Sequence, residues 1–301
     1  MDQSKSFLRE TRFVSLFLLI FALISFNGCM SIQTAARKGN LKEVERQLAL
    51  GVNVNSRHFF TRDTPLIEAA YNGHVEIVKL LIDRGADVNL KGEAWYGPLH
   101  AAAMGGHAEV VKLLLDNGAD VNIFHQDKPL HCAAKNGHIE VAEMLLARGA
   151  DINAKGMSEQ TPLGTAVSNQ QVEMVKFLLS KGADVNIRAI YGCSPLHTAV
   201  SSGNIELARL LLEHGANADF KCNGRTALIA SVFNDDVEMT DMLLSFGADV
   251  NAKDDYENTP LYISYQCDNV EIGRILLANE ADPTIECGGR RIPESFIERL
   301  R

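Results

Sequence analysis

The sequence lacks an excess of positive charge. It has 29 lysine and arginine residues against 38 aspartate and glutamate residues, which gives a formal net charge of -9. Such a charge would repel a nucleic-acid backbone, so we expect no nucleic-acid partner and favour a basic or neutral one. Because 46% of the residues are hydrophobic and only 22% are charged, the sequence also predicts a folded chain with a large core.

Catalytic and cofactor-binding motifs are missing as well. The sequence contains no nucleophile elbow, no Walker loop, no H-E-x-x-H pair and no dinucleotide fingerprint. It also lacks a C-x-x-C pair, and its six cysteines show no regular spacing, so no disulfide framework is implied. We therefore expect no enzymatic activity, no metal site and no cofactor.

No apolar run is long enough to span a bilayer. The N-terminus carries the basic residues Lys5, Arg9 and Arg12, followed by an uncharged apolar run of 14 residues over positions 13–26. A bilayer-spanning helix needs roughly 20 apolar residues. A basic head followed by a short apolar run is typical of a signal peptide, which indicates an exported chain.

The residues Gly28 and Cys29 end this segment and resemble the lipobox of bacterial lipoproteins, although Phe26 stands where that family usually has leucine. The resemblance implies cleavage after residue 28 and lipidation of Cys29. The chain would then be anchored in the bacterial cell envelope, at the periplasmic or the surface face of the outer membrane. A secreted protein and a single-pass anchored protein are the alternatives. Residues 1–28 hold three basic and two acidic side chains, so the remainder has a net charge of -10.

Two short motifs recur in phase along the rest of the chain. The first contains a proline every 31 to 33 residues, with Ala227 in one slot, and its copies are Thr64-Pro65-Leu66, Pro98-Leu99-His100, Pro129-Leu130-His131, Thr161-Pro162-Leu163, Ser194-Pro195-Leu196-His197, Thr226-Ala227-Leu228 and Thr259-Pro260-Leu261. The second motif has the form Ala-Asp-Val/Ile-Asn, and its clear copies begin at Ala86, Ala119, Ala150, Ala183 and Ala248.

Each repeat predicts two helices. Threonine or serine caps the first helix, and proline at its first position gives up an amide that has no helical partner. Small pairs such as Ala69-Ala70 allow neighbouring units to approach closely, and Gly73 and Gly85 end the two helices. These motifs resemble those of the ankyrin-repeat family from about Met30 to the C-terminus. The resemblance implies an all-α solenoid of stacked helix-turn-helix units with β-hairpin fingers, serving as a non-catalytic interaction scaffold.

The repeat register predicts the division of the chain. A signal peptide over 1–28 is followed by the lipidated cysteine and an N-terminal capping repeat over 29–60, in which Met30-Ser31-Ile32 replaces the proline motif. Seven repeats cover 61–288, at about 61–91, 95–124, 126–155, 159–188, 191–220, 223–253 and 256–285. Residues 289–301 are expected to form a C-terminal cap with one polar helix that begins at Pro293.

Several residue types that often carry chemistry occupy fixed slots of the repeat. The histidines fall in two slots (His100, His131 and His197; His74, His107 and His138), and the aspartates in one (Asp87, Asp120, Asp151, Asp184 and Asp249). Stacked helices lie about 8 to 10 Å apart, whereas a zinc ion needs each ligand nitrogen within about 2.1 Å. We therefore expect the histidines to form hydrogen bonds between turns and the aspartates to organise turns.

Two further expectations concern the cysteines. Cys132 is expected to pack in the core as an alanine would, at a small, buried helix position. Cys193 and Cys222 lie in turns of adjacent units, and whether they pair is left open.

Partners of ankyrin repeats, by the same resemblance, contact the finger tips and the exposed face of each first helix, which together form a concave groove. Ten of the fifteen aromatic residues after residue 28 fall in these slots. The predicted partner-binding residues are Phe59, Phe60, Tyr71, Trp95, Tyr96, Met104, Phe124, Tyr191, Phe220, Phe233 and Tyr256. Aromatic side chains are common energetic anchors of interfaces, but they could also brace neighbouring fingers.

The sequence thus predicts a monomeric scaffold, attached to a membrane by a lipid anchor, that binds a protein or peptide partner. Binding of a cell-wall glycan or another small ligand is the alternative, since exposed aromatic rings also suit sugar faces. Fold alone does not name the partner.

Overall fold

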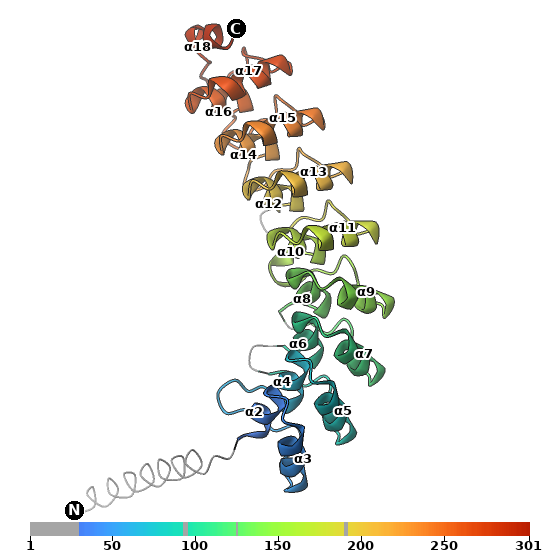
Figure 1. Ribbon diagram of the computed structural model, residues 1–301. Coiled ribbons are helices and arrows are strands. Elements are labelled where there is room, and N and C mark those ends of the chain that lie inside the picture. The colour runs from blue at the N-terminus through green and yellow to red at the C-terminus, as the bar shows by residue number, and fades with distance from the viewer. Residues whose placement is uncertain (1–29, 93–95, 125, 190–191) are drawn as a thin grey trace, which may run out of the picture.

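The computed structural model describes residues 30–92, 96–124, 126–189 and 192–301. The described residues form an elongated stack of short helix pairs, with α2 and α18 at opposite ends (Figure 1). The first helices are α2 (Ile32–Arg37), α4 (Pro65–Tyr71), α6 (Pro98–Gly105), α8 (Pro129–Asn136), α10 (Pro162–Ser168), α12 (Pro195–Ser201), α14 (Ala227–Phe233) and α16 (Pro260–Gln266). The predicted all-α solenoid is confirmed.

The second helices lie along the other side of the stack (Figure 1). They are α3 (Leu41–Ala49), α5 (Val75–Asp83), α7 (Ala108–Asp116), α9 (Ile139–Ala147), α11 (Val172–Ser180), α13 (Ile205–Glu213), α15 (Val237–Ser245) and α17 (Val270–Ala278). A 3-10 turn, η1 (Met157–Glu159), precedes α10, and a single helix, α18 (Glu294–Leu300), follows α17.

The first helices begin where the sequence motif predicts. The Thr64 hydroxyl accepts the Ile67 amide at 3.3 Å, and Pro65 is the first helical residue. Gly73 has a left-handed φ of 73°, and a Cβ there would lie 2.4 Å from Nδ1 of His107. Glycine is therefore needed at this turn both for its backbone conformation and for the close approach of the next unit.

The core runs through the stack between the two rows of helices. The alanine pairs of the first helices are fully buried, and each second helix buries the apolar residues of one face, for example Ile77, Val78 and Leu81 of α5. Each inner unit therefore buries apolar surface against both neighbours, so no single helix pair carries a complete core.

Five of the six repeated histidines link consecutive units, as expected. The exception is His197, whose buried Nε2 has no hydrogen-bond partner among the described residues. Nε2 of His100 and of His131 lies 3.1 Å from a carbonyl oxygen of the following finger, that of Asp127 and of Gln160 respectively. The other set reaches back, since Nε2 of His74, His107 and His138 lies 3.0 to 3.1 Å from the carbonyl oxygens of Arg37, Tyr71 and Met104.

The repeated aspartates and asparagines form a ladder of hydrogen bonds, which confirms their structural interpretation. Within a unit, the amide of Asn122 donates to Oδ1 of Asp120 at 2.9 Å. Between units, Oδ1 of Asn122 accepts the amide of Asp151 at 3.1 Å, and its Nδ2 donates to the Gly149 carbonyl at 2.9 Å. The pattern of side-chain acceptors and backbone donors continues from Asn55 to Thr284.

The fingers, which are the segments that precede the first helices, differ from expectation in one detail. The described residues contain no β-strand, and only the pairs Cys222–Arg225 and Cys287–Arg290 form isolated antiparallel bridges. The prediction of β-hairpins is wrong, because most fingers close with one backbone hydrogen bond, such as the one from Gly156 N to Gln160 O at 2.8 Å. One such bond does not make a ladder.

A disulfide joins Cys193 and Cys222, whose Cα atoms lie 4.4 Å apart. It ties the finger before α12 to the finger before α14 and so encloses one complete helix pair. The spacing of the cysteines in the sequence left this pairing open, because the bond depends on how adjacent fingers stack. Cys132 is buried, as expected for a residue that replaces alanine.

Both ends of the array are capped. At the N-terminal end the Ser31 hydroxyl accepts the Thr34 amide at 3.2 Å and so begins α2. At the C-terminal end α18 is amphipathic, with Phe296, Ile297 and Leu300 buried. The prediction of a polar helix is therefore wrong. The apolar residues of α18 cover the open side of the last pair. Pro293 is its N-cap and not its first residue.

In the part of the chain that the structure describes, no helix combines the length and apolar character needed to cross a membrane.

Candidate partner-binding face

The candidate site is the surface made by the fingers and by the exposed slot near the end of each first helix, here called the finger face. Six predicted site residues on it are exposed: Phe59, Phe60, Tyr71, Phe124, Phe233 and Tyr256. The exposed fraction reaches 74% for Phe59 and Tyr256. Phe59 and Phe60 pack edge to face with ring centroids 5.0 Å apart. Contiguous apolar surface that is exposed to water often marks an interaction site.

Three predicted residues make further contacts within the chain. Arg188 lies over the Phe220 ring at 4.9 Å from the centroid, and Arg225 lies over the Phe233 ring at 4.2 Å. The Tyr96 ring lies 5.6 Å from that of His100. These contacts hold the rings against side chains of the same chain, although Phe233 is still 40% exposed. Trp95, Tyr191 and Cys29 lie outside the described residues.

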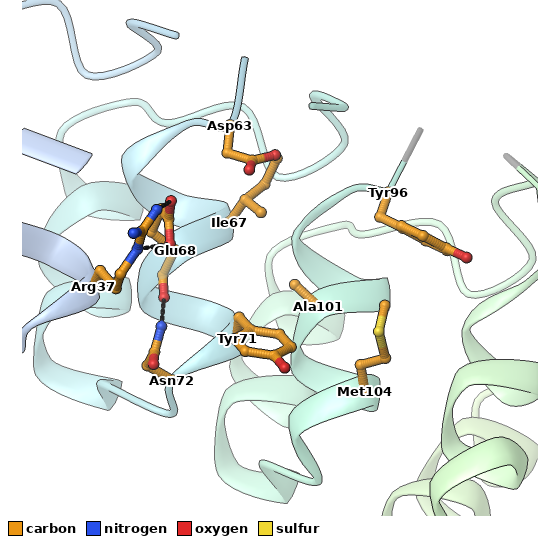
Figure 2. A pocket seen from close by; sticks show the side chains of 9 residues that line it. All are labelled: Arg37, Asp63, Ile67, Glu68, Tyr71, Asn72, Tyr96, Ala101 and Met104. Carbon is orange, nitrogen blue, oxygen red and sulfur yellow. Dashed lines mark hydrogen bonds and ion pairs between the residues drawn. The ribbon is translucent and has the colours of Figure 1, made fainter. Parts of the chain in front are cut away.

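A cavity of about 310 Å³ opens on the finger face between α4 and α6. Figure 2 shows Tyr71 on one side of it, Tyr96 and Met104 on the other, and Ala101 between them. The structure thus brings together three of the predicted residues. The remaining lining residues are Arg37, Asp63, Ile67, Glu68 and Asn72.

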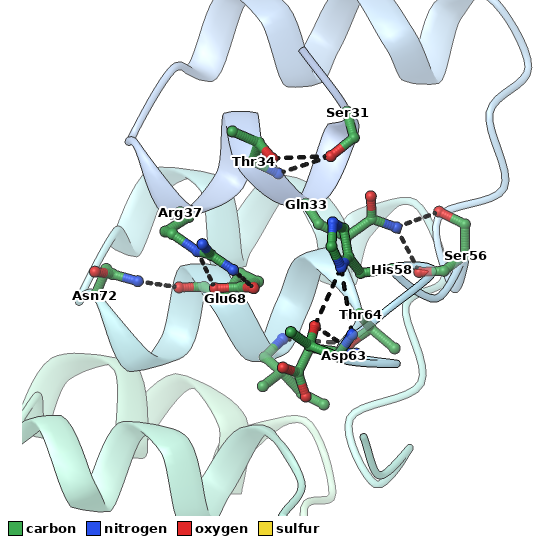
Figure 3. Close-up of polar contacts among 12 residues, drawn as sticks. Ser31, Gln33, Thr34, Arg37, Ser56, His58, Asp63, Thr64, Glu68 and Asn72 are labelled. Atoms are coloured by element: carbon green, nitrogen blue, oxygen red, sulfur yellow. Dashed lines mark hydrogen bonds and ion pairs between the residues drawn. The ribbon is translucent and has the colours of Figure 1, made fainter. Parts of the chain in front are cut away.

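The polar wall of this cavity is held by an ion pair. Nε of Arg37 donates to Oε2 of Glu68 at 2.9 Å, and Nη2 reaches Oε1 (Figure 3). The Glu68 side chain is only 8% exposed, while that of Arg37 is half exposed. The hydrogen bond to Glu68 raises the pKa of Arg37. The charges of these two residues therefore compensate each other within the wall.

Asp63 adds a carboxylate to the same wall. It precedes the N-cap of α4, and its Oδ1 faces Gly92 of the next finger. Burial raises the pKa of the Asp63 carboxyl above its usual range, since water is partly removed from the charged form. No ion pair involves Asp63 among the described residues.

A second cavity of about 240 Å³ lies farther along the finger face. His197, Arg225 and Phe233 line it, beside Cys222 of the disulfide. Burial lowers the pKa of His197. His197 keeps the capping contact to Ser194, with the hydroxyl oxygen 2.8 Å from Nδ1.

Sequence reasoning missed the charged wall formed by Arg37, Asp63 and Glu68. A signal for Glu68 was present, because its slot in the other repeats holds uncharged residues: Ala101, Cys132, Thr165, Thr198, Ala230 and Ile263. A single charged residue in an otherwise uncharged, buried slot indicates a local partner, which here is Arg37 of the preceding unit.

Two features of the described residues bear on metal binding and on nucleophilic catalysis. Within the described ranges no three histidine, cysteine, aspartate or glutamate residues group as metal ligands. Burial raises the pKa of Cys132 to about 12, which makes this thiol a poor nucleophile.

Models of ankyrin repeats match most of the chain. The model for three copies matches residues 91–156, 155–222 and 216–287, and the model for many copies matches 32–82 and 66–115. Among solved structures, the human ASB11 ankyrin repeat domain is 34% identical with a TM-score of 0.65, and the match covers 73% of this chain and 98% of that one.

Curated relatives match over shorter segments. Alpha-latrocrustotoxin-Lt1a of Latrodectus tredecimguttatus is 41% identical over 59 residues, and ankyrin repeat domain-containing protein 49 of Bos taurus is 46% identical over 59 residues. These segments are 20% and 18% of this chain and span only 4% and 23% of the relatives' own lengths.

The family models agree with the structure, which shows stacked helix pairs and the ladder of aspartate and asparagine side chains. Proteins of this kind typically serve as non-catalytic scaffolds for protein-protein interaction. The chain belongs to the ankyrin-repeat family.

Proposed function

We propose that this chain is an exported scaffold, anchored to a bacterial membrane through lipidated Cys29, that holds a protein or peptide partner on its finger face. The observation that carries the binding surface is the row of exposed rings at Phe59, Phe60, Tyr71, Phe124 and Tyr256. Exposed aromatic anchors combine large contact area with few rotatable bonds.

The proposed anchor rests on the sequence before the array. Helix α2 begins at Ile32, three residues after Cys29. At about 3.5 Å per residue the tether would be only about 10 Å long, so the array would sit against the membrane surface. The disulfide between Cys193 and Cys222 supports export, because such bonds persist in oxidising compartments.

The anchor and the partner can be tested together by crosslinking the full-length protein in its native cells, followed by mass spectrometry. We expect one dominant partner protein, crosslinked through the fingers, and membrane fractionation that is lost in Cys29→Ala. Membrane fractionation that survives in Cys29→Ala would contradict the lipid anchor. Adducts with glycan alone would contradict the protein partner and favour a cell-wall ligand.

The finger face is tested by alanine substitutions once that partner is in hand. Tyr71→Ala, Phe124→Ala and Tyr256→Ala should each weaken binding, with at least one loss of about tenfold. Phe246→Ala is the matched control, because Phe246 is also exposed but caps the end of the second helix α15. Equal affinity in all four variants would refute the assignment of the surface.

A further inference from the structure

The cavity between α4 and α6 combines three kinds of surface. Ala101, Ile67 and Met104 give an apolar lining, and Tyr71 and Tyr96 present aromatic rings from two neighbouring units. Carboxylates stand in the wall. An apolar ligand alone would leave the Asp63 carboxylate without water or a counterion, which costs free energy.

The charges of the wall favour a cation. Arg37 is compensated by its ion pair with Glu68, so Asp63 leaves the wall with one negative charge in excess. The tyrosine rings add the negative faces of their π systems, which attract cations within about 6 Å of the ring centroid. The chain as a whole has a net charge of -9, which strengthens the attraction of a cation toward this face.

Resting on the proposed function, we infer that this cavity takes a lysine or arginine side chain of the partner, with its stem over Ala101 and Met104 and its charge between the tyrosine rings and Asp63. The long methylene stems of both residues suit an apolar lining of this kind while their heads remain polar. A volume of about 310 Å³ is sufficient for such a side chain.

Charge complementarity selects this cavity over the second one. Arg225 and His197 line the second cavity, and none of its lining residues is acidic. A basic side chain of the partner would meet Arg225 there with no carboxylate to offset it. The arrangement thus places the basic anchor at the N-terminal half of the array, between the first two units that follow the N-terminal cap.

The test uses the folded chain from Cys29 onward, with Cys29→Ser to leave it unlipidated, and two short probes. One is the peptide Ac-Gly-Ala-Arg-Ala-Gly-amide, and the other replaces arginine with citrulline, which has the same shape without the charge. Backbone amide shifts are followed by NMR during titration. We expect the arginine peptide to shift the amides of Tyr71, Ala101 and Met104 and to bind about fivefold or more tightly than the citrulline peptide.

Two variants and a control locate the effect. Asp63→Asn and Tyr71→Leu should each reduce the preference for arginine about threefold or more. Asp241→Asn on α15 removes the same charge from an exposed helix position remote from the cavity, and it should leave the preference unchanged. Overlay of the amide spectra shows that each variant remains folded.

Equal binding of the two peptides, or shifts confined to other units, would overturn the inference. An equal loss in Asp241→Asn would overturn it as well, because the effect would then be due to net charge and not to the cavity. Failure here is distinguishable from failure of the proposed function, since crosslinks on the finger face would persist while the arginine preference vanished.

Discussion

The disulfide between Cys193 and Cys222 should stabilise one unit of the array more than the others. The two residues are 29 positions apart and enclose α12 and α13. Closing a loop of this length in the unfolded chain removes an entropy worth about 3.6 kcal/mol at 25 °C. Because units of a repeat array open semi-independently, we expect most of this free energy to appear in the local opening of the enclosed pair.

The assay is hydrogen exchange of the purified protein with and without a reductant such as TCEP. On reduction, the amides of α12 and α13 should exchange about a hundredfold faster or more, which corresponds to at least about 2.7 kcal/mol of the opening free energy. The amides of α4 and α5, which lie far along the stack, should exchange as before.

Matched variants separate loss of the bond from other effects of the reductant. Cys193→Ser with Cys222→Ser should reproduce the effect of TCEP, while Cys267→Ser should not, because Cys267 is an exposed free thiol. If reduction changes the exchange of α12 and α13 by less than about threefold, the loop-entropy reasoning is refuted.

Three further perturbations test the fold. Burial lowers the pKa of His131 and His197, so the unfolded chain takes up protons at a higher pH than the folded chain does. The free energy of unfolding, measured by urea titration, should therefore fall as the pH drops below about 6.5 and level off above that pH. Asn122→Ala removes two inter-unit hydrogen bonds and should cost about 1 to 3 kcal/mol, whereas Asn117→Ala, which loses one bond within its own helix, should cost less. A Cβ at position 273 would lie only 2.8 Å from the Leu300 side chain. Gly273→Val should therefore lower the free energy of local opening of α18, measured by hydrogen exchange, by about 1 to 3 kcal/mol.

The fold was predictable because its determinants are local and repeated. Thr64 and Pro65 specify the start of a helix within their own unit, and the same pattern recurs in phase along the chain. The histidine and aspartate slots were interpretable for the same reason, since a residue that recurs at one fixed position of several units points to a role in the repeat itself. Features that occur once were harder, as the buried face of α18 shows.

The candidate site was predictable only in its aromatic part. Tyr71, Tyr96 and Met104 were found by their slots, and they do line one cavity. The carboxylate of Asp63 and the pair formed by Arg37 and Glu68 were missed, because they depend on contacts between units and not on spacing within one unit. The arginines that lie over the rings of Phe220 and Phe233 were missed as well, because they come from outside the motif.

The ladder of aspartate and asparagine side chains has a consequence for how the array can change length. Every rung joins a side-chain oxygen of one unit to a backbone amide of the next, and the amide is the same whatever residue carries it. Asn217 and Asp219 exchange the usual residue types at their two positions and still complete the rungs. An in-frame duplication or loss of one whole unit would therefore create a junction that closes with no compensating substitution, while a shift of a single residue would break the series at once.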